Sequence, residues 1–148
     1  MSAVGFRAVT AQISTGTSAK TLVQVIAASN HRVLLTEVQI AFEGVSATDA
    51  PIQVDILRQT DAGTMSALTL VKANSSDSET LEVTAQHTST GEPTSSDVLL
   101  RTFIHPQSAY RAIVSRENAI VIPGGGRVGI RVTAANSVDA IVTIGGEE

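Results

Sequence analysis

Residues 120–133 read I-V-I-P-G-G-G-R-V-G-I-R-V-T, and this stretch decides the fold class. Val128, Ile130 and Val132 alternate with arginine or glycine, which is the period-2 pattern of a strand that is buried on one face. Pro123 cannot donate a hydrogen bond to a β-ladder, and the three glycines after it can adopt positive φ. We therefore predict a strand, a corner, and a second strand that enters a sheet in a new direction.

The same kind of pattern recurs along the chain, with turn signals roughly every 8–12 residues and no strong helical period. We predict strands at 20–28, 32–43, 52–56, 79–86, 98–104, 110–114, 120–122, 127–134 and 138–144, and a strand or an irregular segment at 65–73. This signature is typical of an antiparallel β-sandwich or barrel, so we predict an all-β fold of jelly-roll type. The predicted core consists of Leu34, Val38, Ile40, Phe42, Ile52, Val54, Ile56, Val128, Ile130, Val132, Val138 and Val142.

The first residues differ in composition from the rest of the chain. Residues 1–19 are small and polar apart from four apolar side chains: Val4, Phe6, Val9 and Ile13. A terminal segment of this kind is often mobile until it buries its apolar side chains on a partner. We therefore predict a flexible N-terminal arm at 1–19, with these four residues binding a partner, followed by a single β-sandwich domain at 20–148.

Composition narrows the function classes. Charged residues make up 16% of the chain, the net charge is −4, and no cluster of Lys or Arg occurs. A nucleic-acid surface needs many cations on one face, so we expect no nucleic-acid partner. The sequence shows no secretory signal and no apolar span of membrane length, so we expect a chain that is made in the cytoplasm and binds no membrane.

Motifs that would carry a reaction are missing from the sequence. The three histidines, His31, His87 and His105, have no second ligand at metal-binding spacing. No Lys-Ser/Thr follows the three glycines of the corner, so they do not form a phosphate loop. No G-x-S-x-G elbow occurs either. We expect no enzyme activity, no cofactor and no metal site.

Three fragments carry a resemblance to a known family. They are residues 61–72 (D-A-G-T-M-S-A-L-T-L-V-K), 90–94 (T-G-E-P-T) and 123–132 (P-G-G-G-R-V-G-I-R-V). In this order they resemble small structural proteins encoded near the capsid genes of tailed bacteriophages and prophages. The resemblance implies a jelly-roll decoration, or cement, protein that forms a homotrimer and binds the major capsid protein on the outside of the virion. It implies no catalytic residues.

Two function classes stay open. In the first, the chain decorates a phage capsid, and the arm of residues 1–19 reaches a neighbouring subunit. In the second, it is a tail or fibre module that binds a receptor or carbohydrate through a long polar loop at residues 86–97. That loop holds only Glu92, Asp97 and a histidine, whereas a glycan site favours aromatic and acidic side chains. We therefore favour capsid decoration.

Overall fold

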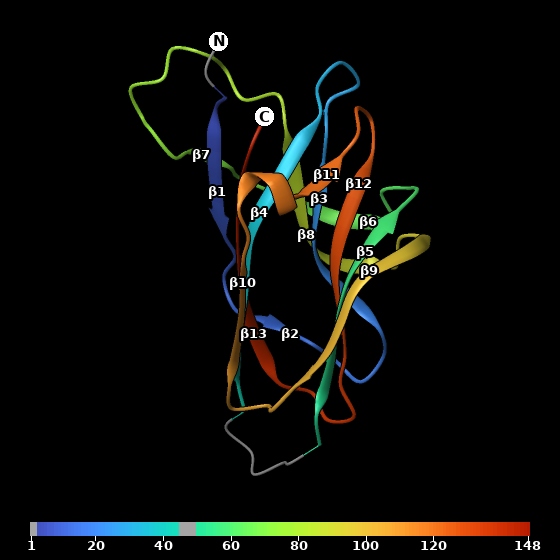
Figure 1. The fold of residues 1–148 in the computed structure, drawn as a ribbon. Coiled ribbons are helices and arrows are strands. Elements are labelled where there is room, and N and C mark those ends of the chain that lie inside the picture. The colour runs from blue at the N-terminus through green and yellow to red at the C-terminus, as the bar shows by residue number, and fades with distance from the viewer. Residues whose placement is uncertain (1–2, 45–49) are drawn as a thin grey trace.

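The structure, a computed structural model, describes residues 3–44 and 50–148. Its strands form two antiparallel sheets that pack face to face (Figure 1), so the predicted all-β sandwich is confirmed. The described residues contain no α-helix and a single 3-10 turn, η1 (Arg116–Asn118). The loop expected between the strands at 32–43 and 52–56 lies largely outside the described residues.

The first sheet has the strand order β10-β4-β13-β1-β7. Two short strands extend it, since β2 pairs with β13 and β11 pairs with β4. The bounds are β1 (Gly5–Val9), β2 (Ile13–Ser14), β4 (Val33–Glu43), β7 (Val71–Lys72), β10 (Ala109–Ile113), β11 (Ile120–Ile122) and β13 (Asp139–Glu147).

The second sheet has the order β6-β8-β3-β12-β5-β9. Its edges are therefore β6 and β9, while β12 lies in the middle between β3 and β5. The bounds are β3 (Lys20–Ile26), β5 (Ile52–Gln59), β6 (Thr64–Leu68), β8 (Thr84–Gly91), β9 (Ser95–Ile104) and β12 (Arg127–Thr133).

The corner predicted at Pro123 carries the chain from one sheet to the other. β11 before it belongs to the first sheet, and β12 after it belongs to the second. Gly125 has φ of 76°, and the backbone N–H of Gly126 donates to Pro123 O at 2.7 Å. The positive φ explains why a glycine stands at the tip of this turn.

The core lies between the inner faces of the two sheets. All twelve residues predicted to form it are at most 8% exposed, and Ile40, Val128, Ile130 and Val132 are fully buried. The strict alternation of β12 explains this result, because every second side chain of a strand points to the same face. Aliphatic side chains fill most of the interior, together with Phe6 and Phe42.

The N-terminal segment is part of the sandwich, which corrects the prediction of a flexible arm. β1 pairs along its whole length with β13 and also pairs with β7. Val4 extends this pairing, since its N–H donates to Glu148 O at 3.1 Å and its carbonyl accepts from Glu148 N at 3.0 Å. Phe6 is 1% exposed in the core. Val4, Phe6 and Ala8 occupy every second position because they line the inner face of a strand.

The segment 86–97, predicted to be a long loop, instead belongs mostly to β8 and the start of β9, with only residues 92–94 between the two strands. β8 pairs with β3 and β6, whereas β9 pairs with β5 at the opposite edge of the sheet. Glu92 fixes this connection, because its carboxylate accepts hydrogen bonds from Thr21 N at 2.9 Å and from Ser89 Oγ at 2.7 Å. The strand predicted to begin at residue 79 begins at Thr84. β8 consists mostly of polar residues, and Ser and Thr occur in both loops and strands. Its sequence therefore did not indicate that it pairs with β3 and β6.

Substitution by alanine should destabilise the protein at one of two adjacent glycines of β13 and have almost no effect at the other. A Cβ at Gly146 would lie 2.3 Å from Leu34 O and 2.9 Å from the Phe6 ring, whereas a Cβ at Gly145 would make only contacts of 3.4 Å or more. We expect Gly146→Ala to lower the free energy of unfolding by about 1–3 kcal/mol through overpacking. Gly145→Ala, the matched control, should change it by less than about 0.5 kcal/mol. Urea denaturation of both variants checks this, and equal losses would contradict it.

Candidate interaction surfaces

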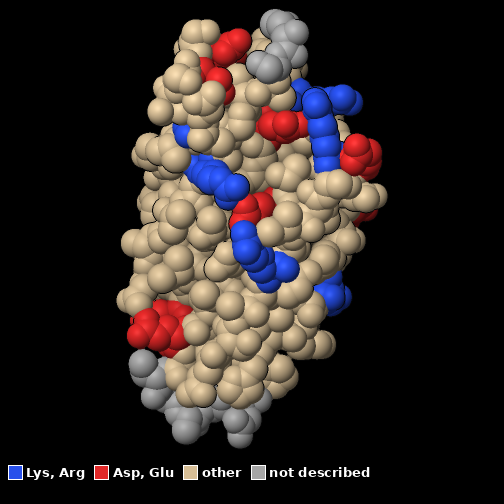
Figure 2. Space-filling model, turned by 60° about the vertical axis from the view of Figure 1, so that its left-hand side comes forward, with Lys and Arg blue, Asp and Glu red and all other residues tan. Residues whose placement is uncertain are grey.

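The outer face of the first sheet carries an ion cluster whose charges satisfy one another. Glu37 of β4 accepts hydrogen bonds from Arg7 of β1 and from Arg111 of β10, the second at 3.1 Å between Arg111 Nη2 and Glu37 Oε1. The hydrogen bond from Arg7 lowers the pKa of Glu37, and with Arg111 it outweighs the opposite effect of burial. Around such clusters, the face that carries β1 and β10 is mostly uncharged (Figure 2).

A second ion cluster lies on the outer face of the second sheet. Asp55 of β5 is 1% exposed, although it alternates with the core residues Val54 and Ile56 and so lies on the face away from the core. Arg101 Nε donates to its Oδ1 at 2.7 Å, and Arg131 Nη2 donates to its Oδ2 at 3.1 Å. Burial raises the pKa of Asp55, but the hydrogen bonds from Arg101, Arg131 and Gln53 together hold it below its ordinary value.

Apolar side chains are exposed along one lateral edge of the sandwich. β9 and β10 are the edge strands of the two sheets, and a short corner of residues 105–108 joins them. The two strands meet at this corner and diverge from it (Figure 1). Most of the large apolar residues that are exposed lie here, with Phe103 at 63% and Ile113 at 59%. We call this group the edge surface; it consists of Val98, Leu99, Phe103, Ile113 and Val114.

The edge surface also offers backbone groups for pairing. Among the described residues, β9 pairs only with β5 and β10 pairs only with β4. Soluble proteins usually protect such edges with lysine, proline or a covering segment, because an open edge is a template for another chain. β9 and β10 contain no lysine or proline. An exposed apolar edge of this kind is typical of a protein–protein contact.

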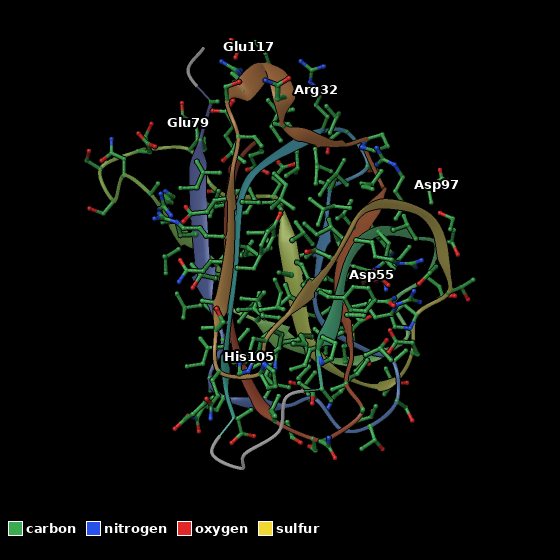
Figure 3. The ribbon with its side chains drawn as sticks, turned by 60° about the horizontal axis from the view of Figure 1, so that its bottom comes forward. Arg32, Asp55, Glu79, Asp97, His105 and Glu117 are labelled. Carbon is green, nitrogen blue, oxygen red and sulfur yellow. The ribbon has the colours of Figure 1, made fainter. Side chains whose placement is uncertain are left out.

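A cavity of about 520 Å³ lies at the end of the sandwich that carries Ala3 and Glu148. The two chain ends lie at this end (Figure 1). We call it the end cavity. Arg32 and Glu79 lie towards this end, together with Glu117 of η1, whereas His105 lies at the opposite end (Figure 3). The lining consists of Ala3, Val4, His31, Arg32, Leu34, Glu79, Thr80, Glu82, Arg116, Glu147 and Glu148.

The residues predicted to bind a partner are mainly core residues. Val4, Phe6 and Ile13 are 6%, 1% and 4% exposed, and only Val9, at 61%, presents its side chain to solvent. As the chain is folded, Phe6 and Ile13 offer no surface to a partner, and Val4 offers only the small part that lines the end cavity. A partner-binding role for this set stays a prediction, which Phe6 and Ile13 cannot serve without opening the first sheet.

The histidines are dispersed, as their spacing predicts. His31 Nδ1 lies 2.8 Å from Glu82 Oε2, and His87 Nδ1 lies 2.8 Å from Thr88 Oγ1. Residues 3–44 and 50–148 contain no group of three or more His, Asp or Glu side chains that could hold a metal ion. In the same ranges, no helix has the length and apolar character needed to cross a membrane.

Comparison with known proteins returned no match to a family model, a curated protein or a solved structure. The features that bear on function are therefore the two surfaces described above and the resemblance in residues 61–72, 90–94 and 123–132.

Proposed function

We propose that the chain is a structural virion protein that decorates the outside of a tailed-phage capsid, as a homotrimer bound to the major capsid protein. The observation that carries the proposal is the edge surface, where apolar side chains and unpaired strand edges are exposed together. A subunit of a permanent assembly can have such a surface, because contact with the neighbouring proteins buries it.

The order of the strands supports a jelly roll as the finer description of the fold. β1, β4, β10 and β13 belong to the first sheet, whereas β3, β5, β9 and β12 belong to the second, and the chain changes sheet at every step along these eight strands except from β5 to β9. Eight strands shared between two sheets in this way are typical of the jelly roll. In this interpretation, β6, β7 and β8 form an insertion between β5 and β9.

Contacts between copies would use the edge surface. In a closed ring of three, each copy presents one surface to the next copy and receives a different surface from the copy before it. Many equivalent trimers on one shell would then stabilise it through multivalent attachment, even where a single contact is weak. The mostly uncharged face in Figure 2 suits this role, because few charges would lose their water on contact.

The test is co-sedimentation of the protein with phage heads. We expect the double variant Phe103→Asp/Ile113→Asp to lose head binding by at least about tenfold, because two charges would enter an apolar contact. Both side chains are largely exposed, so the variant should fold. Light scattering on the free proteins in solution should show the wild-type chain as a trimer and the variant as a monomer.

Val71→Asp is the matched control, because Val71 is 57% exposed on β7, outside the edge surface. It should bind heads as the wild type does. Equal binding by all three proteins would rule out the edge surface as the contact. Deletion of residues 1–19 is a poor control, since it would remove β1 and β2 from the first sheet.

The second candidate function is a tail or fibre module that binds a receptor or carbohydrate. The end cavity favours it, since a concave site of this size suits a small ligand. The polar segment 86–97 does not, because most of it is paired within the second sheet, as β8 and the start of β9. A glycan array separates the two candidates: glycan binding without any binding to heads would replace the decoration proposal.

A further inference from the structure

The end cavity has an apolar floor that the fold holds in place. Ala3, Val4 and Leu34 provide it, and Val4 and Leu34 are only 6% and 8% exposed. The two backbone hydrogen bonds between Val4 and Glu148 fix the floor to the ends of β1 and β13. Its volume of about 520 Å³ lies within the range of small-ligand sites.

Most of the charged groups around this floor are engaged with one another. His31 pairs with Glu82 at 2.8 Å, and Arg116 Nε lies 2.6 Å from Glu147 Oε1. The Glu148 carboxylate accepts the backbone N–H groups of Glu82 and Val83, each at 2.8 Å. These contacts tie the irregular segment before β8 to the end of β13, so the walls of the cavity are positioned before any ligand arrives.

Two charged side chains of the lining are not engaged. Among the described residues, neither Arg32 nor Glu79 makes an ion pair or a side-chain hydrogen bond, and both are exposed. The lining holds four carboxylates, of Glu79, Glu82, Glu147 and Glu148, against the two guanidinium groups of Arg32 and Arg116. Among carboxylates and guanidinium groups, the cavity therefore has an excess of two negative charges, which favours a positively charged ligand.

We propose that the end cavity binds an organic cation with a short apolar body, either a free alkylammonium ion or the side chain of a lysine on another protein. The alkyl part would cover Val4 and Leu34, and the ammonium group would pair with the Glu79 carboxylate at the rim. Hydrogen bonds between charged groups are stronger than those between neutral groups, so Glu79 supplies specificity. This site is separate from the edge surface and does not depend on a role in capsid decoration.

The test is an NMR titration of the ¹⁵N-labelled chain with n-butylammonium chloride. We expect saturable shifts, confined to amides of the cavity lining, with a dissociation constant in roughly the millimolar range for so small a probe. Butyrate and n-butanol have the same length without the positive charge, and they should cause no saturable shift. Saturation by butyrate to the same extent, or no saturation by butylammonium, would overturn the proposal.

Three variants assign the binding to the cavity. Glu79→Gln should weaken butylammonium binding by about tenfold, because the amide keeps the shape and removes the charge. Arg32→Gln should strengthen it by about twofold or more, since a like charge is removed. Asp97→Asn is the matched control, because Asp97 is an exposed acid far from the cavity (Figure 3), and it should leave binding unchanged. If Glu79→Gln and Asp97→Asn behave alike, the proposal is wrong.

A second probe distinguishes the two sources of the cation. If acetyl-lysine-amide binds as tightly as butylammonium and acetyl-norleucine-amide does not, the ligand is a lysine side chain presented by a protein. If butylammonium binds and acetyl-lysine-amide is excluded, the ligand is a free amine. Failure of the head-binding test would not affect either result, so the two proposals can fail independently.

Discussion

Ile130→Asp is expected to abolish folding of the chain. Ile130 is fully buried in the middle of β12, where it is paired with Val23 of β3 and Ile56 of β5. No cation lies in this aliphatic layer to pair with a carboxylate. The cost of an unpaired buried charge exceeds about 5 kcal/mol, which is comparable to the total stability of about 5–15 kcal/mol of a typical domain.

Circular dichroism and thermal denaturation measure this effect. Ile130→Asp should show no cooperative unfolding transition. The control is Thr133→Asp, which puts the same side chain at an exposed position of the same strand and should unfold cooperatively near the wild-type temperature. Ile130→Ala gives a graded result, with an expected loss of about 2–5 kcal/mol. A cooperative, wild-type-like transition for Ile130→Asp would show that Ile130 is not a core residue.

Asp55→Ala is expected to have the next largest effect, a loss of about 3–5 kcal/mol in the free energy of unfolding. The substitution removes the acceptor that Arg101 and Arg131 share. The Arg101 side chain is half-exposed, so its guanidinium group can form hydrogen bonds with water instead. Only 21% of the Arg131 side chain is exposed. Arg131 Nε is already buried without an acceptor, so the guanidinium would lose the contact that compensates for its burial. Urea denaturation of wild type and variant at neutral pH measures the loss.

The lowered pKa of Asp55 also predicts how stability depends on pH. A carboxyl with a lower pKa in the folded state than in the unfolded state stabilises the fold fully above the unfolded value, here 3.8. This stabilisation is lost as the pH falls through the lower pKa of the folded state. We therefore expect the difference in stability between wild type and Asp55→Ala to shrink between neutral pH and about pH 2. A difference that stays constant over this range would contradict the pKa assignment.

Alternation along the strands made the core predictable. In β12, from Val38 to Phe42 of β4, and from Ile52 to Ile56 of β5, large apolar residues occupy every second position because one face packs on the other sheet, so period 2 identifies the buried side there. The same rule failed for Asp55, which lies on the outer face. Its burial depends on Arg101 of β9 and Arg131 of β12, and nothing in the sequence near residue 55 indicates that these side chains cover it.

Pairing partners were harder to predict than strands. The alternation of Val4, Phe6 and Ala8 was visible in the sequence, but their strand pairs with the far end of the chain, so a terminal arm was an equally good interpretation. β8 gave no periodic signal, because buried Ser89 and Ala85 are small and its other residues are mostly polar. Local sequence does not specify contacts of this kind.

The two candidate surfaces differ in how far the sequence could have shown them. The apolar run at Val98, Leu99 and Leu100 breaks the alternation of β9, and Phe103 falls on its outer face, so the edge surface did have a signal. The end cavity had none. Its lining comes from separate parts of the chain, near residues 3, 31, 79, 116 and 147, which only the folded sandwich brings together.

β13 follows the other described strands along the chain, yet it lies between β1 and β4 in the first sheet. Until β13 has left the ribosome, the pairing of that sheet allows only two separate pieces, β1 with β7 and β4 with β10 and β11. Translation at about 5–20 residues per second keeps these pieces apart until β13 has been made. Closure of the sheet must therefore wait for β13, and we expect it at the millisecond-to-second pace of β-sandwiches whose contacts join distant parts of the chain.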